Sequence, residues 1–503
     1  LIRVYDNISE SKMSLTVYIL CFVLFLLILL TVRHYSTSNR KYWAIRNIPY
    51  QEPCPIFGNF GATFTTRISY SQTLQYFYNK YRENKFVGIF QARRPALLVA
   101  DLDIVKQIIN EKSSCFTDRV AVFTDTRREP LLRNLFNMSG AEWKAMRHVV
   151  TPTFSPAKMK AMFPLIAECA EALRNTICAE SSDVTNIPRL TVKYTTDVIG
   201  SCAFGVNPGS MKDENSPFLI MSKKMHRVNV AVIIKRYCRS FFPQIFKWLN
   251  FRTYSVEVET FFTSIIKEVL DKRRQNSEKR DDFLQLMMSQ QKNASELKIT
   301  DELIISNSFI FMLAGLDTSS TTLSFCMYEI AKRKELQDEL RQEIRECYDR
   351  HNGLTYESVS SMNLLFRTIL ETLRKHPPSP MITRLCNADC SISGLDLKVK
   401  DLIMIPIQCI QNDPRYFLEP DRFDPDRFID NLNPPGFLAF GGGPRICLGT
   451  KFSHLTMLAA LAEILISYEV EPCSRTTPTI QYETRSFILK NKGGIWLRLR
   501  KLN

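Results

Sequence analysis

The fold of this chain is decided by one stretch near its C-terminus, Phe440-Gly-Gly-Gly-Pro-Arg-Ile-Cys-Leu-Gly449. Three consecutive glycines permit positive φ and let the backbone approach a flat group closely. Pro444 stiffens the turn. Cys447 stands just before an apolar helical pattern at 452–466, so we expect it at a helix N-terminus, where free N–H groups and the helix dipole favour a thiolate over a thiol.

Two other interpretations of this stretch have less support. A glycine loop around an inert, buried cysteine would not need the whole F-x-x-G-x-x-x-C-x-G spacing. A phosphate-binding loop would end in Lys-Ser or Lys-Thr, and a dinucleotide site would need an acidic residue that is not found here. The stretch therefore predicts a cysteine that ligates a cofactor.

A long, proline-free apolar segment, Ile299–Lys334, predicts a helix of about 50 Å that crosses the whole domain. Thr300 can cap its start. Midway along it stands Ala314-Gly-Leu-Asp-Thr318, and a glycine inside a helix costs ~1 kcal/mol relative to alanine. A pocket for oxygen would offset that cost, with a hydroxyl at Thr318 and a proton relay at Asp317. Taken alone, a kinked structural helix explains the same residues equally well.

Further charged pairs lie between these two segments. Glu371 and Arg374 stand three apart on one helix face, and Pro425-Asp-Arg-Phe428 supplies Arg427. Trp143 and Arg147 lie one turn apart, and Arg384 follows a proline-rich turn. If each is considered alone, the Glu371–Arg374 pair and Arg384 would be solvated surface residues, and Trp143 would be a core residue.

Together these motifs resemble the cytochrome P-450 superfamily in order and spacing, over nearly the whole chain. The resemblance implies a mainly α fold with small β-sheets, a haem b held by Cys447, and a haem-thiolate monooxygenase. It also implies a buried structural triad, two catalytic residues and a set of cofactor-binding residues. These are Glu371, Arg374 and Arg427 for the triad; Thr318 and Asp317 for catalysis; and Cys447, Arg445, Trp143, Arg147, Arg384, Ala314, Phe440 and Gly449 for the haem, with Trp143 and the three arginines at its propionates.

The N-terminal segment 13–32 carries no charge and is long enough, at about 30 Å, to cross a bilayer. It ends in Arg33 and His34 without a small-residue cleavage site, so an uncleaved anchor is favoured over a signal peptide or a core helix. Basic residues after it predict a cytosolic body. We divide the chain into an extension that is luminal or not native (1–12), the anchor (13–32), a basic, proline-rich linker (33–59) and one catalytic domain (60–503).

Other patterns predict local elements. Phe86–Phe90 and Ala96–Ala100 predict a hairpin, and so do Ser486–Lys490 and Gly494–Arg500. Helical spacing predicts helices at Ala157–Ser181 and Val256–Arg274. The 14 scattered cysteines predict free thiols and not a disulfide framework.

The chain has 66 Lys plus Arg against 51 Asp plus Glu, a net charge of +15. No nucleic-acid-binding motif accompanies this excess, so an acidic partner or an anionic membrane is the expected counterpart. Lys144, Arg445 and Lys451 are the expected docking cations on the cysteine side. Segments 151–160 and 196–205 are similar to the insect microsomal detoxification branch, the sixth family of clan three. That resemblance implies NADPH–cytochrome P-450 reductase as electron donor, with cytochrome b5 as an optional second, at the endoplasmic reticulum membrane.

The substrate pocket should be apolar. Its expected liners are Val120, Phe123, Ile310, Phe311, Ala314, Met381, Ile382, Phe487 and Ile488, several of which would serve equally well as core. Lipophilic xenobiotics such as plant toxins or insecticides, or endogenous hormones and lipids, are the expected substrates. A P-450-like isomerase or dehydratase that needs no NADPH, a non-catalytic haem sensor and a tethered structural protein without haem are the alternatives.

Overall fold

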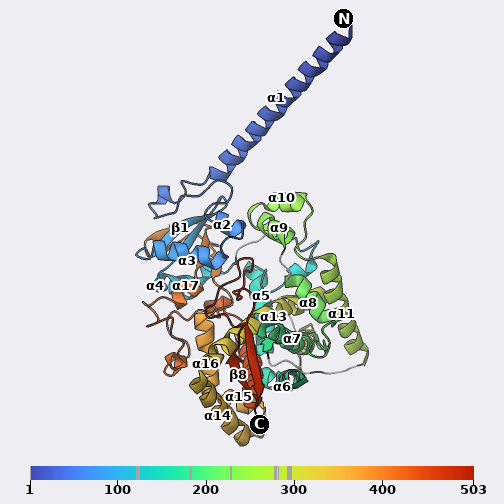
Figure 1. The fold of residues 1–503 in the computed structure, drawn as a ribbon, viewed down its shortest axis with the longest axis vertical. Coiled ribbons are helices and arrows are strands. Elements are labelled where there is room, and N and C mark those ends of the chain that lie inside the picture. The colour runs from blue at the N-terminus through green and yellow to red at the C-terminus, as the bar shows by residue number, and fades with distance from the viewer. Residues whose placement is uncertain are drawn as a thin grey trace.

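A computed structural model describes residues 2–119, 125–179, 184–226, 229–276, 280, 282–291 and 297–502. Helices make up most of this structure and the strands form small sheets, which confirms the predicted fold class. Figure 1 shows a body of packed helices with the sheets at its edges, and one long helix that extends away from it.

The α-helices are α1 (Ile2–Thr37), α2 (Gly61–Phe64), α3 (Tyr70–Lys80), α4 (Leu102–Lys106), α5 (Gly140–Val150), α6 (Pro156–Ala179), α7 (Ile187–Ile199), α8 (Pro217–His226), α9 (Val230–Phe241), α10 (Pro243–Trp248), α11 (Val256–Asn276), α12 (Phe283–Gln290), α13 (Asp301–Ala331), α14 (Lys334–His351), α15 (Tyr356–Ser361), α16 (Asn363–Lys375), α17 (Ile407–Gln411) and α18 (Thr450–Ser467). Short 3-10 or π turns are η1 (Ala44–Arg46), η2 (Gln107–Glu111), η3 (Ser113–Phe116), η4 (Pro130–Leu132), η5 (Thr151–Phe154), η6 (Gly200–Phe204), η7 (Pro425–Phe428) and η8 (Gly443–Arg445). The helix expected at 256–274 is thereby confirmed, and the one expected at 157–181 is confirmed as far as Ala179, because residues 180 and 181 lie outside the described residues.

The strands are β1 (Phe86–Gln91), β2 (Arg94–Val99), β3 (Val184–Asn186), β4 (Ile382–Leu385), β5 (Cys390–Ile392), β6 (Leu395–Leu397), β7 (Leu402–Ile405), β8 (Tyr468–Pro472) and β9 (Trp496–Lys501). β1, β2, β7 and β4 form one sheet in that order, β3, β9 and β8 a second, and β5 and β6 a third. The hairpin predicted at 86–100 is confirmed as the antiparallel pair β1–β2. In the first sheet Arg384 of β4 pairs with Ile403 of β7. Arg384 belongs to the site described below.

The hairpin predicted from 486–490 and 494–500 is wrong. β9 pairs antiparallel with β8 and β3 instead. The Asn491 side chain accepts a hydrogen bond from Gln481 N–H at 3.0 Å and donates one to the Gly494 carbonyl at 2.6 Å, which turns the chain away from residues 486–490. The segment before it folds back on itself, because Glu483 N–H donates to the Lys490 carbonyl at 2.8 Å.

Helix α13 forms the centre of the body, where it contacts α7, α16 and α18. Its start is capped as expected, since the Thr300 hydroxyl accepts from Leu303 N–H at 3.4 Å. The structure explains the glycine at Gly315 by helix packing, where the sequence suggested an oxygen pocket. A Cβ there would lie 2.6 Å from the Ile199 Cδ1 atom, so the glycine allows α7 to pack closely against α13.

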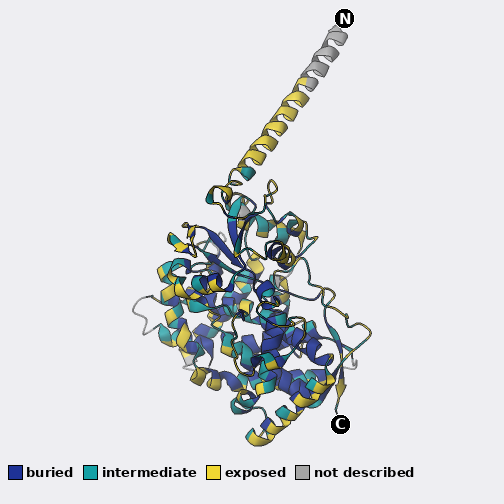
Figure 2. Cartoon of the chain, turned by 90° about the vertical axis from the view of Figure 1, so that its left-hand side faces the viewer, coloured by how far each residue is buried: buried dark blue, intermediate teal, exposed yellow. Residues whose placement is uncertain are grey.

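Helix α1 stands apart from the body. Between Thr16 and Thr37 its mean hydropathy is 2.5, and none of the most apolar window is buried (Figure 2). An exposed apolar helix of this length is unfavourable in water and matches the thickness of a bilayer. The second long apolar helix, α13, is mostly buried and belongs to the core.

Candidate active site

The cysteine loop is held by its own backbone. Cys447 N–H donates to the Phe440 carbonyl at 2.9 Å, and Gly441 N–H donates to the Leu438 carbonyl at 2.8 Å. Gly443 has φ +63°, and a Cβ there would meet the Ile109 carbonyl oxygen at 1.7 Å. Glycine is therefore required where this loop crosses the 107–111 turn.

Cys447 lies three residues before Thr450, the first residue of α18, as expected. Its side chain is exposed, yet surrounding protein desolvates it and raises the pKa of the thiol. These two facts together show that the side chain faces an internal space. The Gly449 N–H, the Thr450 hydroxyl, Arg119 and Arg147 act against burial by lowering that pKa. The Gly449 N–H thus acts in the expected direction, and desolvation outweighs it. A bound metal ion would deprotonate this sulfur.

Arg445 is buried and fixes the loop to distant segments. Its guanidinium donates to the Thr117 carbonyl at 2.6 Å and to the Met138 carbonyl at 2.8 Å. It also lies 3.8 Å from the centre of the Trp143 ring, a cation–π contact. Because only 4% of Arg445 is exposed, it cannot present charge to a docking protein, and that part of the prediction is wrong.

Four arginines gather near the cysteine: Arg119, Arg147, Arg384 and Arg445. Within the described part of the chain, Asp118 is the one carboxylate paired with any of them, at 3.7 Å from Arg445. Burial and the neighbouring Arg119 lower the pKa of Arg384 to about 9, and burial lowers that of Arg119 to about 10. Arg384 and Arg445 are buried, and Arg119 and Arg147 are half-buried. A cluster with so much uncompensated positive charge fits a ligand that carries two carboxylates, as haem does.

Sequence reasoning missed Arg119. Its guanidinium donates to the Arg445 carbonyl at 3.5 Å and lies 4.2 Å from the Phe136 ring centre. No motif marks this arginine in the sequence. Trp143, expected at a propionate, is buried and packs against Arg445, so its visible contact is with the arginine.

Ala314 and Thr318 lie one turn apart on α13. Ala314 is exposed although most of its helix is buried, so it lines an internal space. The Thr318 hydroxyl donates to the Ala314 carbonyl at 2.6 Å. Asp317 is 4% exposed, and its two carboxylate oxygens each lie 3.1 Å from the Lys490 Nζ atom.

The expected triad is brought together away from solvent. Glu371 and Arg374 have fully buried side chains and form a bidentate pair at 2.7 and 2.9 Å. Arg427 Nε lies 3.4 Å from the same carboxylate. Arg374 also donates to the Gln411 carbonyl at 2.9 Å, so the pair connects α16 to the segment that leads to the cysteine loop.

Gln411 is a second residue that sequence reasoning did not assign to the site. Its side-chain amide donates to the carbonyls of Leu373 and Arg374 at 2.9 and 2.8 Å. Its side-chain oxygen accepts from Leu438 N–H at 2.7 Å. One buried amide thus joins α16 to the start of the cysteine loop.

The expected substrate-pocket residues divide into groups. Ile382 Cδ1 lies 3.7 Å from the position of a Cβ on Gly441, beside the cysteine loop, and Phe487 is 43% exposed. Phe311 is half-buried and packs against the rings of Phe154 and Phe283, and its assignment to the pocket stays a prediction. Of the remaining expected liners, Ile310 is buried, and Met381 and Ile488 are half-buried. Val120 and Phe123 fall outside the described residues.

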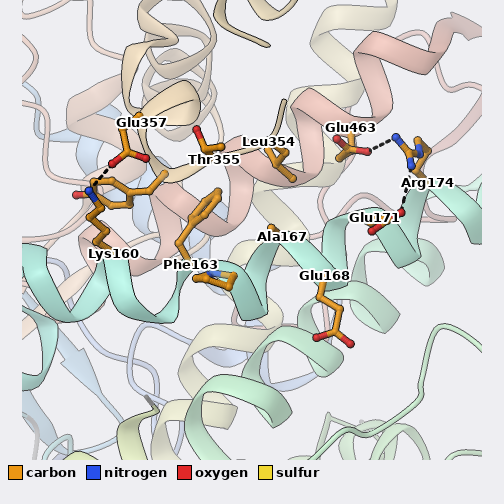
Figure 3. A pocket seen from close by; sticks show the side chains of 12 residues that line it. Lys160, Phe163, Ala167, Glu168, Glu171, Arg174, Leu354, Thr355, Glu357 and Glu463 are labelled. Atoms are coloured by element: carbon orange, nitrogen blue, oxygen red, sulfur yellow. Dashed lines mark ion pairs between the residues drawn. The ribbon is translucent and has the colours of Figure 1, made fainter. Parts of the chain in front are cut away.

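A separate groove of about 680 Å³ opens between α6, α15 and α18 (Figure 3). Lys160 and Glu357 form an ion pair at 2.5 Å at one end, and Arg174 and Glu463 form another at 2.9 Å at the other end. None of the residues expected at the haem lines it.

A mainly helical body, a cysteine beside the first turn of α18 that faces an internal space, and a cluster of buried and half-buried arginines beside that cysteine define a haem-thiolate protein. The family model for cytochrome P450 matches residues 48–498. The chain belongs to the cytochrome P450 family, and it is a haem-thiolate monooxygenase that receives electrons from a redox partner.

Its relatives include insect proteins of the sixth cytochrome P450 family. Cytochrome P450 6k1 of Blattella germanica is 32% identical over 93% of this chain and 94% of its own length. Cytochrome P450 6a2 of Drosophila melanogaster is 32% identical over 92% of this chain and 96% of its own length. The probable cytochrome P450 6a23 of the same fly is 31% identical over 98% of this chain and its full length.

Proposed function

We propose that this protein hydroxylates or epoxidises lipophilic small molecules with O₂ and with electrons that originate from NADPH. The observation that supports this most directly is Cys447, whose side chain is exposed although the surrounding protein desolvates its thiol. Haem bound through this sulfur supplies the oxygen chemistry, because a thiolate ligand favours O–O cleavage. Xenobiotics such as plant toxins and insecticides, or endogenous hormones and lipids, are the proposed substrates.

The chain's own residues would hold the haem b and move protons. Arg119, Arg147, Arg384 and Arg445 would neutralise its two carboxylates, while the backbone at Phe440 and Gly449 keeps the sulfur in place. The remaining roles fall to α13. Ala314 would leave room for the cofactor, and the Thr318 hydroxyl, which donates to the Ala314 carbonyl in this structure, would hold and pass a proton that Asp317 supplies.

The proposed electron donor is NADPH–cytochrome P450 reductase, with cytochrome b5 as an optional second donor. Lys144 on α5 and Lys451 on α18 are exposed near the cysteine side and would meet an acidic docking surface. With Arg445 buried, these two lysines remain as the proposed docking cations.

The proposed location is the endoplasmic reticulum membrane, with α1 as a single anchor and the body in the cytosol. α9 and α10 lie at the end of the body from which α1 projects (Figure 1). Several of their large apolar side chains are exposed, among them Val230, Ile245 and Trp248. These residues would rest on the bilayer, where their burial in lipid is favourable.

The test is the absorption spectrum of the reduced, CO-bound protein, followed by product analysis with reductase. We expect a Soret band shifted strongly to the red, and an oxygenated product that forms only with NADPH. Cys447→Ala should lose both. Product formation without NADPH would instead identify an isomerase or dehydratase, and a red-shifted band without any product would identify a haem sensor.

A further inference from the structure

Helix α9 carries an arginine on the face that points away from the expected bilayer. Val230 and Ile234 are exposed on one face of this helix, which belongs to the apolar surface that would rest on the membrane. Arg236 stands two residues after Ile234, about 200° further around the helix, so it lies on the opposite face. The cation is therefore directed away from the apolar surface.

The two flanks of α9 pack against other parts of the body. On one flank, the Tyr237 ring centre lies 4.5 Å from that of Phe64 in α2. On the other flank, Lys235 Nζ lies 5.6 Å from the ring centre of Phe251, in the segment that leads into α11. Figure 1 shows α9 at the end of the body from which α1 projects. Arg236 lies between these flanks, so α9 forms a bridge with the guanidinium on its inner side.

The surroundings of Arg236 show that this inner side is a concave space. The side chain is exposed, yet the surrounding protein desolvates it and lowers the pKa of its guanidinium. Tyr254 lies near enough to act against that shift, and its ring centre lies 5.0 Å from that of Phe309 on α13. The space below α9 is therefore bounded by a residue that packs on the helix carrying Ala314.

The charge of Arg236 lacks an internal partner. Within the described part of the chain, no carboxylate forms an ion pair with its guanidinium or influences its pKa. The second arginine of α9 differs: burial lowers the pKa of Arg239, and Tyr254 and Glu129 act against burial. Glu129 is 3% exposed and accepts from Thr253 N–H at 2.7 Å. One cation of α9 thus has a nearby carboxylate, and Arg236 has none.

A desolvated guanidinium without a counter-charge is unfavourable, and a carboxylate on a ligand would remove that cost. The two groups match in shape, because they join through two parallel N–H···O bonds. The single uncompensated charge of Arg236 fits a carboxylate, which carries one negative charge. A phosphate monoester, with a charge of about −1.5 to −2, fits it less well.

The remainder of such a ligand would contact aromatic rings. Tyr70 lies near Tyr237, and its ring centre lies 6.0 Å from that of Phe487, in the segment 481–492 that we call the C-terminal loop. Phe487 is 43% exposed and is an expected substrate contact. With Tyr254 on the opposite flank, apolar surface borders Arg236 on two sides, which suits a hydrocarbon chain.

We propose that Arg236 binds the carboxylate of the substrate, and that this protein acts on amphipathic carboxylic acids whose hydrocarbon chain extends toward Cys447. This inference rests on the proposed monooxygenase function and names its substrate class. Because the carboxylate is held at α9, oxygen enters the chain far from the acid group. One atom of O₂ enters a C–H bond, and the other leaves as water with two protons and two electrons from NADPH.

The first test measures binding of dodecanoic acid and of its methyl ester to the full-length, haem-loaded protein by equilibrium dialysis, which does not depend on turnover. We expect the acid to bind about tenfold more tightly, because hydrogen bonds between charged groups are the stronger ones. Arg236→Met should remove this difference and leave binding of the ester unchanged. The matched control is Lys247→Met, which removes an exposed cation from α10 at the same end of the body and should keep the difference.

Three results would overturn the inference. They are equal binding of acid and ester by the unaltered protein, an equal loss of both ligands in Arg236→Met, and a loss of acid binding in Lys247→Met as large as that in Arg236→Met. The last result would mean that general attraction to basic charge near the membrane holds the acid. The comparison of acid with ester needs no variant, so it decides the question even if Arg236→Met folds poorly.

The second test is the position of the new hydroxyl group after turnover of dodecanoic acid with reductase and NADPH. It should lie in the last few carbons, and Arg236→Met should spread it along the chain. Oxygenation beside the carboxyl group, or no oxygenated acid from a protein that oxidises other substrates, would contradict the inference. A failure of the proposed function would look different, because the protein would then lack the red-shifted CO band or any NADPH-dependent product, while dialysis would still separate acid from ester.

Discussion

The cysteine side and the substrate side of this molecule are built in opposite ways. On the cysteine side, one contiguous run, 438–450, carries the ligand and closes on itself through backbone hydrogen bonds such as the one from Cys447 to Phe440. On the substrate side, Ala314, Ile382 and Phe487 come from a helix, a strand and a loop that are far apart in the sequence.

The difference has consequences for what each side can tolerate. The cysteine side is reinforced by buried polar groups with many partners, so a single change there should affect stability or haem retention. The substrate side is held by apolar packing and by one partly exposed ion pair, so a change there should alter selectivity and leave the fold intact.

The strongest test of this contrast is Arg374→Met. It removes the bidentate partner of the fully buried Glu371 carboxylate, which keeps Arg427 at 3.4 Å, and it removes the donor to the Gln411 carbonyl. We expect a loss of about 3–5 kcal/mol in the free energy of unfolding, with reduced haem content, measured by denaturant titration. Arg367→Met on the same helix is the control, because its partner Asp426 is 65% exposed and the pair should be worth at most ~1 kcal/mol. Equal losses in the two variants would contradict the contrast.

Arg384→Met should separate stability from haem retention. Its guanidinium is buried beside Arg119, which together with burial lowers its pKa to about 9. Removal of this charge relieves repulsion, so the haem-free protein should be no less stable. The haem-loaded protein should lose haem about tenfold faster or more, since a charge-assisted bond is worth roughly 1.5–3 kcal/mol. Transfer of haem to an excess of apomyoglobin measures this rate, and an unchanged rate in Arg384→Met would remove this arginine from the proposed site.

The same contrast explains how much could be predicted from the sequence. The cysteine loop and the Glu371–Arg374 pair were found because each is a short motif whose parts meet within a few residues. The hairpin at 486–500 failed because β9 takes its partners from 184–186 and 468–472, and a pairing over such distances leaves no local signal. Arg119 was missed for the same reason, because it joins the cluster only through tertiary packing.

Gly315 shows a second limit. It was expected beside an oxygen pocket because of its place in the motif, yet a Cβ there would lie 2.6 Å from the Ile199 Cδ1 atom, so the glycine makes room for α7. A sequence shows that a helix is apolar on several faces, but which face meets the cavity depends on neighbours from distant segments. A motif therefore predicts which residue type stands at a position better than it predicts which way that side chain points.

Phe487→Ala tests the substrate side. The ring is partly exposed in the C-terminal loop, so its loss should leave the unfolding free energy and the CO-bound spectrum unchanged. Affinity for a bulky lipophilic ligand, measured by the change in haem absorbance on binding, should fall roughly fivefold, which corresponds to part of a buried phenyl group. Leu418→Ala, at an exposed site on another loop, should change neither quantity. A fall in stability for Phe487→Ala would place this ring in the core instead.

The smallest expected effect concerns the outer surface of the cysteine side. Lys144→Glu with Lys451→Glu reverses two exposed charges without touching the loop or the arginine cluster. Reduction by NADPH–cytochrome P450 reductase should slow by about twofold to fivefold at low salt, and the difference should disappear near 1 M salt, where charges are screened within about 3 Å. Lys212→Glu with Lys223→Glu is the matched control, because it reverses two exposed charges away from α5 and α18. If both double variants slow reduction equally, net charge and not a docking surface governs the encounter.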